Sequence, residues 1–147
     1  MEIKYTFHWR KRGGDLREIL FRGQRFDNTD WVFGGYLPKT KTICTENTHP
    51  NSTEYIDLFI KPETLGQYTG MNDIKNKKIF EGDIVKFKRI NALGYTTSRV
   101  GEVQYYDELP IFYIYANTGD AWDWVDCEEI EVIGNIHDNP ELMENEK

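Results

Sequence analysis

The stretch from Pro62 to Phe87 reads PETLGQYTGMNDIKNKKIFEGDIVKF and carries the strongest structural signal in the chain. It begins with turn-forming residues and ends with a glycine turn at 81–83, which leads into alternating apolar and charged residues. Neighbouring side chains of a β-strand point to opposite faces of its sheet. The alternation therefore predicts a strand with two different faces, one formed by Val85 and Phe87 and the other by Lys86 and Lys88.

The composition of the chain favours strands over helices. Aromatic residues make up 14% of its 147 residues, whereas alanine, the best helix former, occurs only at positions 92, 116 and 121. A hydrophobic content of 39% is sufficient for the core of one domain or of two closely packed lobes. The sequence shows neither a signal peptide nor the run of about 20 apolar residues that spans a bilayer, so we expect a cytoplasmic protein without a membrane segment.

Strand-forming runs separated by turn signals predict an all-β fold. One hairpin is expected around the turn at 27–30, and two further strands flank the polar loop at 46–53. Five more strands are expected near residues 84–89, 99–106, 111–116, 121–125 and 129–136. Consecutive antiparallel strands of this kind predict a small SH3-like barrel in the C-terminal half. Asn139 followed by Pro140 predicts a short C-terminal helical turn with Asn139 as its N-cap.

Three blocks of sequence stand out by their residues and by their order along the chain. They are Arg17-Glu18-Ile19 with Phe21-Arg22-Gly23 and Trp31-Val32-Phe33-Gly34; Ile60, Pro62, Thr64 to Gly70, Asp73 and Ile79 to Val85; and Glu131 to Ile136 with Asn139 to Leu142. Together they resemble the YopX family, which is encoded mainly by phages and prophages. The resemblance covers Leu16 to about Met143. It implies an all-β fold of bent, coiled antiparallel sheets, a bacterial host cell as the setting, and no established activity.

The chain departs from that family pattern at two places. Asn76-Lys77 stands where the family tends to have Asn-Gly, and lysine is a poor residue for the positive φ that a two-residue primed turn requires. We therefore expect a longer or differently formed turn. The second departure is a leader, residues 1–15, ahead of the usual family start. The remaining residues, 16–147, are expected to form a single YopX-like domain with lobes at about 16–75 and 76–137 and an acidic tail at 138–147.

The leader alternates between apolar and polar side chains, as an amphipathic edge strand does. Its apolar face consists of Ile3, Tyr5, Phe7 and Trp9. An unpaired strand exposes both such a face and its backbone hydrogen-bonding groups, so the leader is expected to dock on another surface. Docking on a second copy predicts a closed homo-oligomer, most simply a dimer. Alternatively, the leader is a translated upstream extension, because residues 11–14 can be encoded by a purine-rich run ahead of a start at Leu16.

Charge is unevenly distributed along the chain, whose formal net charge is −7. Residues 1–25 contain seven basic and three acidic residues, a net charge of +4, and residues 75–99 contain seven and two, a net charge of +5. Residues 120–147 contain ten acidic residues and one lysine, a net charge of −9. Such a distribution can steer a partner or pair two segments of the chain, although a solvated surface explains it equally well.

Aromatic residues near residue 115 are the main candidates for a binding surface. In a strand, Tyr113 and Tyr115 share one face and Phe112 and Ile114 the other, and one of these sets has to form core. The set left outside could be a stacking platform for bases, a peptide groove or an oligomer contact. The basic and aromatic residues together form the set of candidate binding residues: Lys86, Lys88, Arg99, Tyr113, Tyr115, Trp122 and Trp124. The two tryptophans are two positions apart and are expected to share a face.

No arrangement of residues in the sequence indicates catalysis or a cofactor. The three histidines have no flanking nucleophile or ligand spacing, and the carboxylates at 120–131 lack the loop pattern of a calcium site. Cys44 and Cys127 are isolated, which predicts two reduced, partly buried thiols. We therefore expect no enzyme activity, no metal and no cofactor.

Three functions remain from this reasoning, of which an enzyme has the least support because no acid/base pair or metal set can be named. The first is a non-enzymatic interaction module that self-associates or binds a phage or host protein. The alternative is weak binding of single-stranded nucleic acid by Lys86, Lys88 and Arg99 beside exposed aromatic residues. The local charge of residues 75–99 favours the alternative, whereas the net charge and a pI near 5.0 oppose it.

Overall fold

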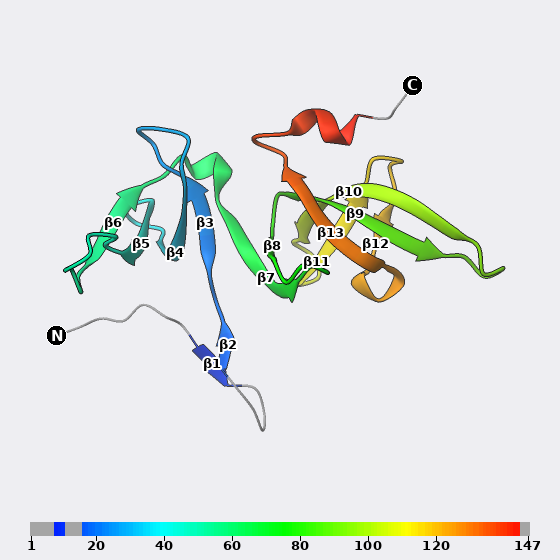
Figure 1. Ribbon diagram of the computed structural model, residues 1–147, viewed down its shortest axis with the longest axis horizontal. Helices are drawn as coiled ribbons and strands as arrows, with labels where there is room; N and C mark the ends of the chain where they lie inside the picture. The colour runs from blue at the N-terminus through cyan, green and yellow to red at the C-terminus, as the bar shows by residue number, and fades with distance from the viewer. Residues whose placement is uncertain (1–7, 11–15, 145–147) are drawn as a thin grey trace. The chain divides into compact units, whose positions relative to one another are not determined.

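The computed structural model describes residues 8–10 and 16–144, which consist mostly of antiparallel strands with short 3-10 helices (Figure 1). The predicted all-β class is thereby confirmed. The chain divides into two compact units, Met1–Gly70 (unit 1) and Met71–Lys147 (unit 2). The boundary falls inside strand β7 (Gly66–Asn72), which begins in unit 1 and continues into unit 2.

Unit 1 contains a two-stranded sheet and a larger one. The small sheet pairs β1 (His8–Arg10) with β2 (Leu16–Glu18). The larger sheet has the order β6-β5-β4-β3-β7 and extends to β8 of unit 2. Its other elements in unit 1 are β3 (Phe21–Gln24), β4 (Trp31–Leu37), β5 (Thr42–Glu46) and β6 (Tyr55–Phe59), with the 3-10 helix η1 (Pro62–Thr64) before β7.

The ends of β3 and β6 meet, although two strands separate them in the sheet order. An isolated bridge joins Arg25 to Ile60, the Phe26 N–H donates to the Phe59 carbonyl (2.9 Å), and the Lys61 N–H donates to the Gln24 carbonyl (2.9 Å). These bonds require the four strands to curl, and Ile43 and Ile60 are buried. The curl satisfies backbone groups that a flat sheet would leave exposed at its edge.

Unit 2 is organised around a five-stranded sheet with the order β12-β11-β10-β9-β13. Its elements are β8 (Lys78–Phe80), β9 (Asp83–Ile90), β10 (Thr96–Tyr106), β11 (Ile111–Ala116), β12 (Ala121–Trp122), η2 (Trp124–Asp126), β13 (Glu128–Asn135) and η3 (Pro140–Met143). Within the described residues β12 and β13 are the two edges, so the sheet is open and the predicted SH3-like barrel is not confirmed. The 3-10 helix η3 has Asn139 at its N-cap position and a proline at its start, as the sequence predicted, although the Asn139 side chain makes no capping hydrogen bond.

The alternation of β9 separates the core from the outer surface of this sheet. Val85 and Phe87 are fully buried and Lys86 is exposed, as the sequence predicted. Residues from β8, β10, β11 and β13 complete the apolar core: Ile79, Val103, Ile114, Ala116 and Ile130. Burial of such side chains contributes about 1.5–3 kcal/mol each, so this core is the main source of stability in unit 2.

Three hairpins of unit 2 close with the same kind of turn, spanning 73–77, 91–95 and 116–120. In each, the first residue's N–H donates to the fifth residue's carbonyl, and the fourth residue's N–H donates back to the first residue's carbonyl. The fourth residue has a positive φ, +62° at Asn76, +81° at Gly94 and +91° at Gly119. This is a three-residue loop that ends in a left-handed residue. The chain can therefore do without glycine at Lys77, because Asn76 takes the left-handed position.

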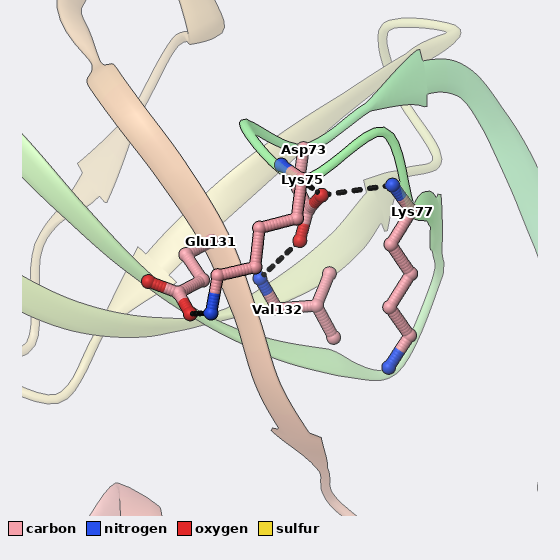
Figure 2. A network of polar contacts seen from close by, with 5 residues as sticks. All are labelled: Asp73, Lys75, Lys77, Glu131 and Val132. Atoms are coloured by element: carbon pink, nitrogen blue, oxygen red, sulfur yellow. Dashed lines mark hydrogen bonds and ion pairs between the residues drawn. The ribbon is translucent and has the colours of Figure 1, made fainter.

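Asp73 ties the first of these turns to β13 (Figure 2). Its Oδ1 accepts hydrogen bonds from the N–H groups of Lys75 (2.8 Å) and Lys77 (2.9 Å), and its Oδ2 accepts one from the N–H of Val132 (3.0 Å). Burial opposes ionisation of this carboxyl group, but the three N–H donors together with the charge of Lys77 outweigh burial and lower its pKa. The turn is also joined to β13 by a Lys75–Glu131 ion pair. One buried carboxylate thus links two segments about sixty residues apart.

Candidate functional site

The register of β10 and β11 decides which aromatic set is core. Ile114 pairs with Val103 and both are fully buried, whereas Tyr115 is 40% exposed. Directly opposed residues lie on the same face of a sheet. The outer face therefore carries the cross-strand pairs Glu102 with Tyr115, Gln104 with Tyr113 and Tyr106 with Ile111. The sequence left open which set is outside, and the structure shows that it is the tyrosines.

These outer residues line a pocket of about 340 Å³ within unit 2. We call it the aromatic pocket. It is formed by β10, β11 and β12 with the turn between β10 and β11, and its lining residues are Tyr106, Leu109, Ile111, Tyr113, Tyr115, Ala121, Trp122 and Asp123. The lining includes four aromatic side chains and only one ionisable acid, so its character is apolar and aromatic.

Hydrogen bonds hold two of the tyrosines in place. The Tyr113 hydroxyl donates to Gln104 Oε1 (2.6 Å), and Gln104 Nε2 donates to Glu102 Oε2 (3.0 Å). The Tyr106 hydroxyl donates to Glu108 Oε2 (3.0 Å). The rings of Tyr106 and Tyr113 meet edge to face, with centroids 6.1 Å apart. Fixed rings lose little side-chain freedom when a ligand binds, which favours affinity.

The electrostatic environment of the pocket is negative. Burial raises the pKa of Tyr113, and the charges of Glu102 and Asp107 raise it further. Tyr113 is therefore a neutral phenol at physiological pH. The Arg89 guanidinium lies over one of the aromatic lining residues, because its carbon is 3.7 Å from the centroid of the Trp122 ring.

The predicted basic residues do not form one cluster. Lys86 opposes Glu131 on β13, and Lys88 Nζ lies 2.6 Å from Glu129 Oε2. Arg99 opposes the buried Phe87, which places it on the inner face, away from the two lysines, and its buried Nε has no hydrogen-bond partner in the described part of the chain. Each of the two lysines of β9 thus lies next to a carboxylate of β13. Nucleic-acid binding stays a prediction.

The expectation that Trp122 and Trp124 share a strand face is wrong. β12 ends at Trp122 because the Asp123 side chain accepts a hydrogen bond from the Val125 N–H (3.4 Å) and caps η2. Trp122 lines the aromatic pocket. Trp124 is not among the lining residues, and its Nε1 donates to the Phe112 carbonyl (2.8 Å). Both tryptophans pack against the core, and Trp122 is directly opposite the buried Ile114.

Three of the candidate self-association residues, Ile3, Tyr5 and Phe7, lie outside the described residues. The fourth, Trp9, belongs to β1 and pairs with Arg17 of β2. The segment that contains Trp9 is therefore paired with its own chain, and self-association stays a prediction.

Unit 1 has a larger hollow of about 700 Å³ that contains none of the predicted site residues. Its lining mixes basic, acidic and apolar groups, and Arg25 is already paired with Asp27. The lining residues are Arg25, Phe26, Asp27, Thr40, Lys41, Asp57, Leu58, Phe59, Ile60 and Pro62. Because both signs of charge are present, this hollow does not define a class of ligand.

Within residues 8–10 and 16–144 there is no group of three or more His, Cys, Asp or Glu side chains that could hold a metal ion. Cys44 and Cys127 are free and partly buried, as predicted. Burial raises the pKa of Cys127 to about 11, and the charges of Asp126 and Asp123 add to the effect. The Cys127 thiol is therefore protonated at neutral pH, and a thiol in that state is a poor nucleophile.

The fold and the site together describe an all-β protein of two units with an aromatic surface pocket. The family model for the YopX protein matches residues 21–144, and the chain belongs to the YopX family. No curated protein matches the chain. The described helices are 3-10 turns of three or four residues, none of which has the length or the composition of a membrane span.

Sequence reasoning found Tyr113, Tyr115 and Trp122 but missed the other five lining residues of the pocket. Tyr106 and Ile111 become neighbours through the hairpin register, and Leu109 lies in the connecting turn. The available signal was the turn at 107–110, because a short hairpin loop places the residues on its two sides opposite each other.

Proposed function

We propose that this protein is a non-enzymatic interaction module that binds a protein segment in the aromatic pocket. The observation that supports it is the gathering of Tyr106, Tyr113 and Tyr115 of the outer face, with Trp122 of the edge strand β12, around one hollow. Tyrosine and tryptophan are enriched at the residues that dominate protein interfaces, because they combine large apolar area with a polar group. Membership of the YopX family supports a phage or prophage setting, with a partner in the cytoplasm of a bacterial host.

The size of the pocket supports a partner side chain rather than a large ligand. About 340 Å³ is at the low end of the range of about 300–1,000 Å³ for small-molecule sites. One or two anchoring side chains of a bound segment fill such a volume. The hydroxyls of Tyr106 and Tyr113 lie beside carboxylate and amide groups, so polar contacts are available around an apolar centre.

Binding of single-stranded nucleic acid is the second candidate. Its supporting observation is that Lys86 and Lys88 belong to the same outer face as the tyrosines, with β10 between them. The carboxylates beside both lysines weigh against it, because they reduce the positive field that a phosphate backbone requires.

The proposal is tested by panning a random library of 12-residue displayed peptides against the full-length chain. Enriched peptides are then measured against Tyr115→Ala and against Tyr55→Ala, which removes a tyrosine of similar exposure (44%) from β6 of unit 1. We expect Tyr115→Ala to weaken binding tenfold or more and Tyr55→Ala to leave it within twofold. The proposal would be contradicted if the enriched peptides bound both variants as tightly as the original chain. It would also be contradicted if no peptide were enriched.

A further inference from the structure

We infer that the segment bound in the aromatic pocket is basic and carries a lysine or arginine beside a large apolar residue. This inference rests on the proposed function and specifies the chemistry of the partner. It follows from the charge around the pocket, from the state of each carboxylate there and from the aromatic lining.

Carboxylates surround the pocket. Asp123 is part of the lining, Glu108 is bonded to the lining residue Tyr106, and Glu102 is opposite Tyr115. Asp107 begins the turn that contributes Leu109, and its charge acts on Tyr113. No lysine or arginine is among the lining residues, and the Arg89 guanidinium over the Trp122 ring is outnumbered by these four carboxylates. The potential in the pocket is therefore negative and favours a cationic side chain.

These carboxylates are not neutralised within the described part of the chain. Glu102 is bonded to the Gln104 amide, Glu108 to a tyrosine hydroxyl and Asp123 to a backbone N–H, all of which are neutral groups. This differs from β13, where Glu129 and Glu131 are paired with lysines. A basic ligand would thus form new ion pairs without breaking existing ones, and in a partly enclosed site these exceed the value of a surface pair.

The aromatic lining provides a second attraction for a cation. A lysine or arginine over a tyrosine or tryptophan ring is attracted by the negative face of the ring, and more strongly when the cation is desolvated. The chain already uses this contact, because the Arg89 guanidinium lies over Trp122 and the Arg22 guanidinium lies 4.8 Å from the centroid of the Trp31 ring. The apolar residues Leu109 and Ile111 at the pocket then account for a neighbouring apolar side chain on the partner.

The test uses the displayed-peptide library on the full-length chain, and takes the peptides whose binding is lost in Tyr115→Ala. We expect most of them to contain lysine or arginine, and we expect replacement of that residue by glutamine to weaken binding about tenfold. Asp107→Lys reverses one charge at the pocket on an exposed turn residue. This substitution should weaken binding of the basic peptides about fivefold at 50 mM salt. The loss of affinity should be smaller at 300 mM salt because salt screens exposed charges. The matched control is Glu63→Lys, which reverses the charge of an exposed residue in η1 and should leave peptide binding unchanged.

The outcomes separate this inference from the function on which it rests. Tyr115-dependent peptides that are neutral or acidic and insensitive to Asp107→Lys would overturn the inference and leave the interaction module standing. The absence of any Tyr115-dependent peptide would overturn both. Tyr115-dependent binding of a 20-residue oligothymidine probe that becomes tighter in Asp107→Lys would overturn the inference in favour of nucleic acid.

Discussion

Replacement of Asp73 by asparagine should destabilise the protein by about 3 kcal/mol, although the two side chains have nearly the same shape. The carboxylate accepts three backbone hydrogen bonds, two on Oδ1 and one on Oδ2 (Figure 2). An asparagine keeps one acceptor oxygen and presents an NH₂ group on the other side, where at least one N–H donor then meets another donor. Hydrogen bonds to charged groups contribute about 1.5–3 kcal/mol each, and a buried unsatisfied donor costs about 1–3 kcal/mol.

Urea unfolding followed by tryptophan fluorescence measures this loss. The lower stability corresponds to a decrease of roughly 12–24 °C in the unfolding temperature for a unit of the length of Met71–Lys147. Asp107→Asn, the same substitution at an exposed residue of unit 2, should change the free energy of unfolding by less than about 0.5 kcal/mol. A loss below about 1 kcal/mol for Asp73→Asn would refute the reasoning.

The pH dependence gives an independent check of the same prediction. The pKa of Asp73 is lower in the folded chain than its ordinary value of 3.8, so its ionised form stabilises the fold at pH values above 3.8. This contribution is lost as the pH falls from 3.8 through the folded-state pKa. The difference between the original chain and Asp73→Asn should therefore be constant near neutral pH and shrink in acid. A difference that stays constant into acid would show that the charge of Asp73 is not its source.

Three further predictions concern the leader and the basic strand. A chain that starts at Leu16 and lacks residues 1–15 should unfold within about 2 °C of the full-length chain by differential scanning calorimetry, and insolubility would show that the leader is structurally required. Light scattering at micromolar concentration should show a dimer for the full-length chain and a monomer for Tyr5→Asp/Trp9→Asp, whereas a monomer in both cases would rule out self-association through the leader. If single-stranded DNA binds, it should do so weakly, with an affinity that falls steeply with salt and is abolished by Lys86→Glu/Lys88→Glu; no salt-sensitive binding at low ionic strength would exclude nucleic acid.

The alternation of β9 was predictable because it depends on one short segment, in which burial of Val85 and Phe87 requires Lys86 to point outward. The openness of the sheet was not predictable, because closure depends on whether the edge strands β12 and β13 pair with each other. The short length of β12 was missed for a local reason. Asp123 offers the backbone a cap, and that hydrogen bond replaced the extended conformation that the alternation of Trp122 and Trp124 predicted.

The candidate site was also only partly predictable from the sequence. Alternation established that Tyr113 and Tyr115 share a face, but only the packing of Ile114 against Val103 decides that this face is the outer one. Tyr106 and Ile111 join the site through a cross-strand register, which depends on two segments at once, and Leu109 joins it through the turn between them. The residues of such a pocket can be identified in a single sequence, but the strand register that brings them together cannot.

The hydrogen bond from Trp124 Nε1 to the Phe112 carbonyl also covers part of the backbone edge of β11. β12 contains only two residues, so part of β11 lies beyond its reach at this edge of the sheet. An uncovered backbone edge is a template on which further strands can stack into fibrils. The indole ring occupies one of the acceptors that such stacking would need. Addition of a further strand at this edge is therefore disfavoured, although aromatic side chains beside it are exposed.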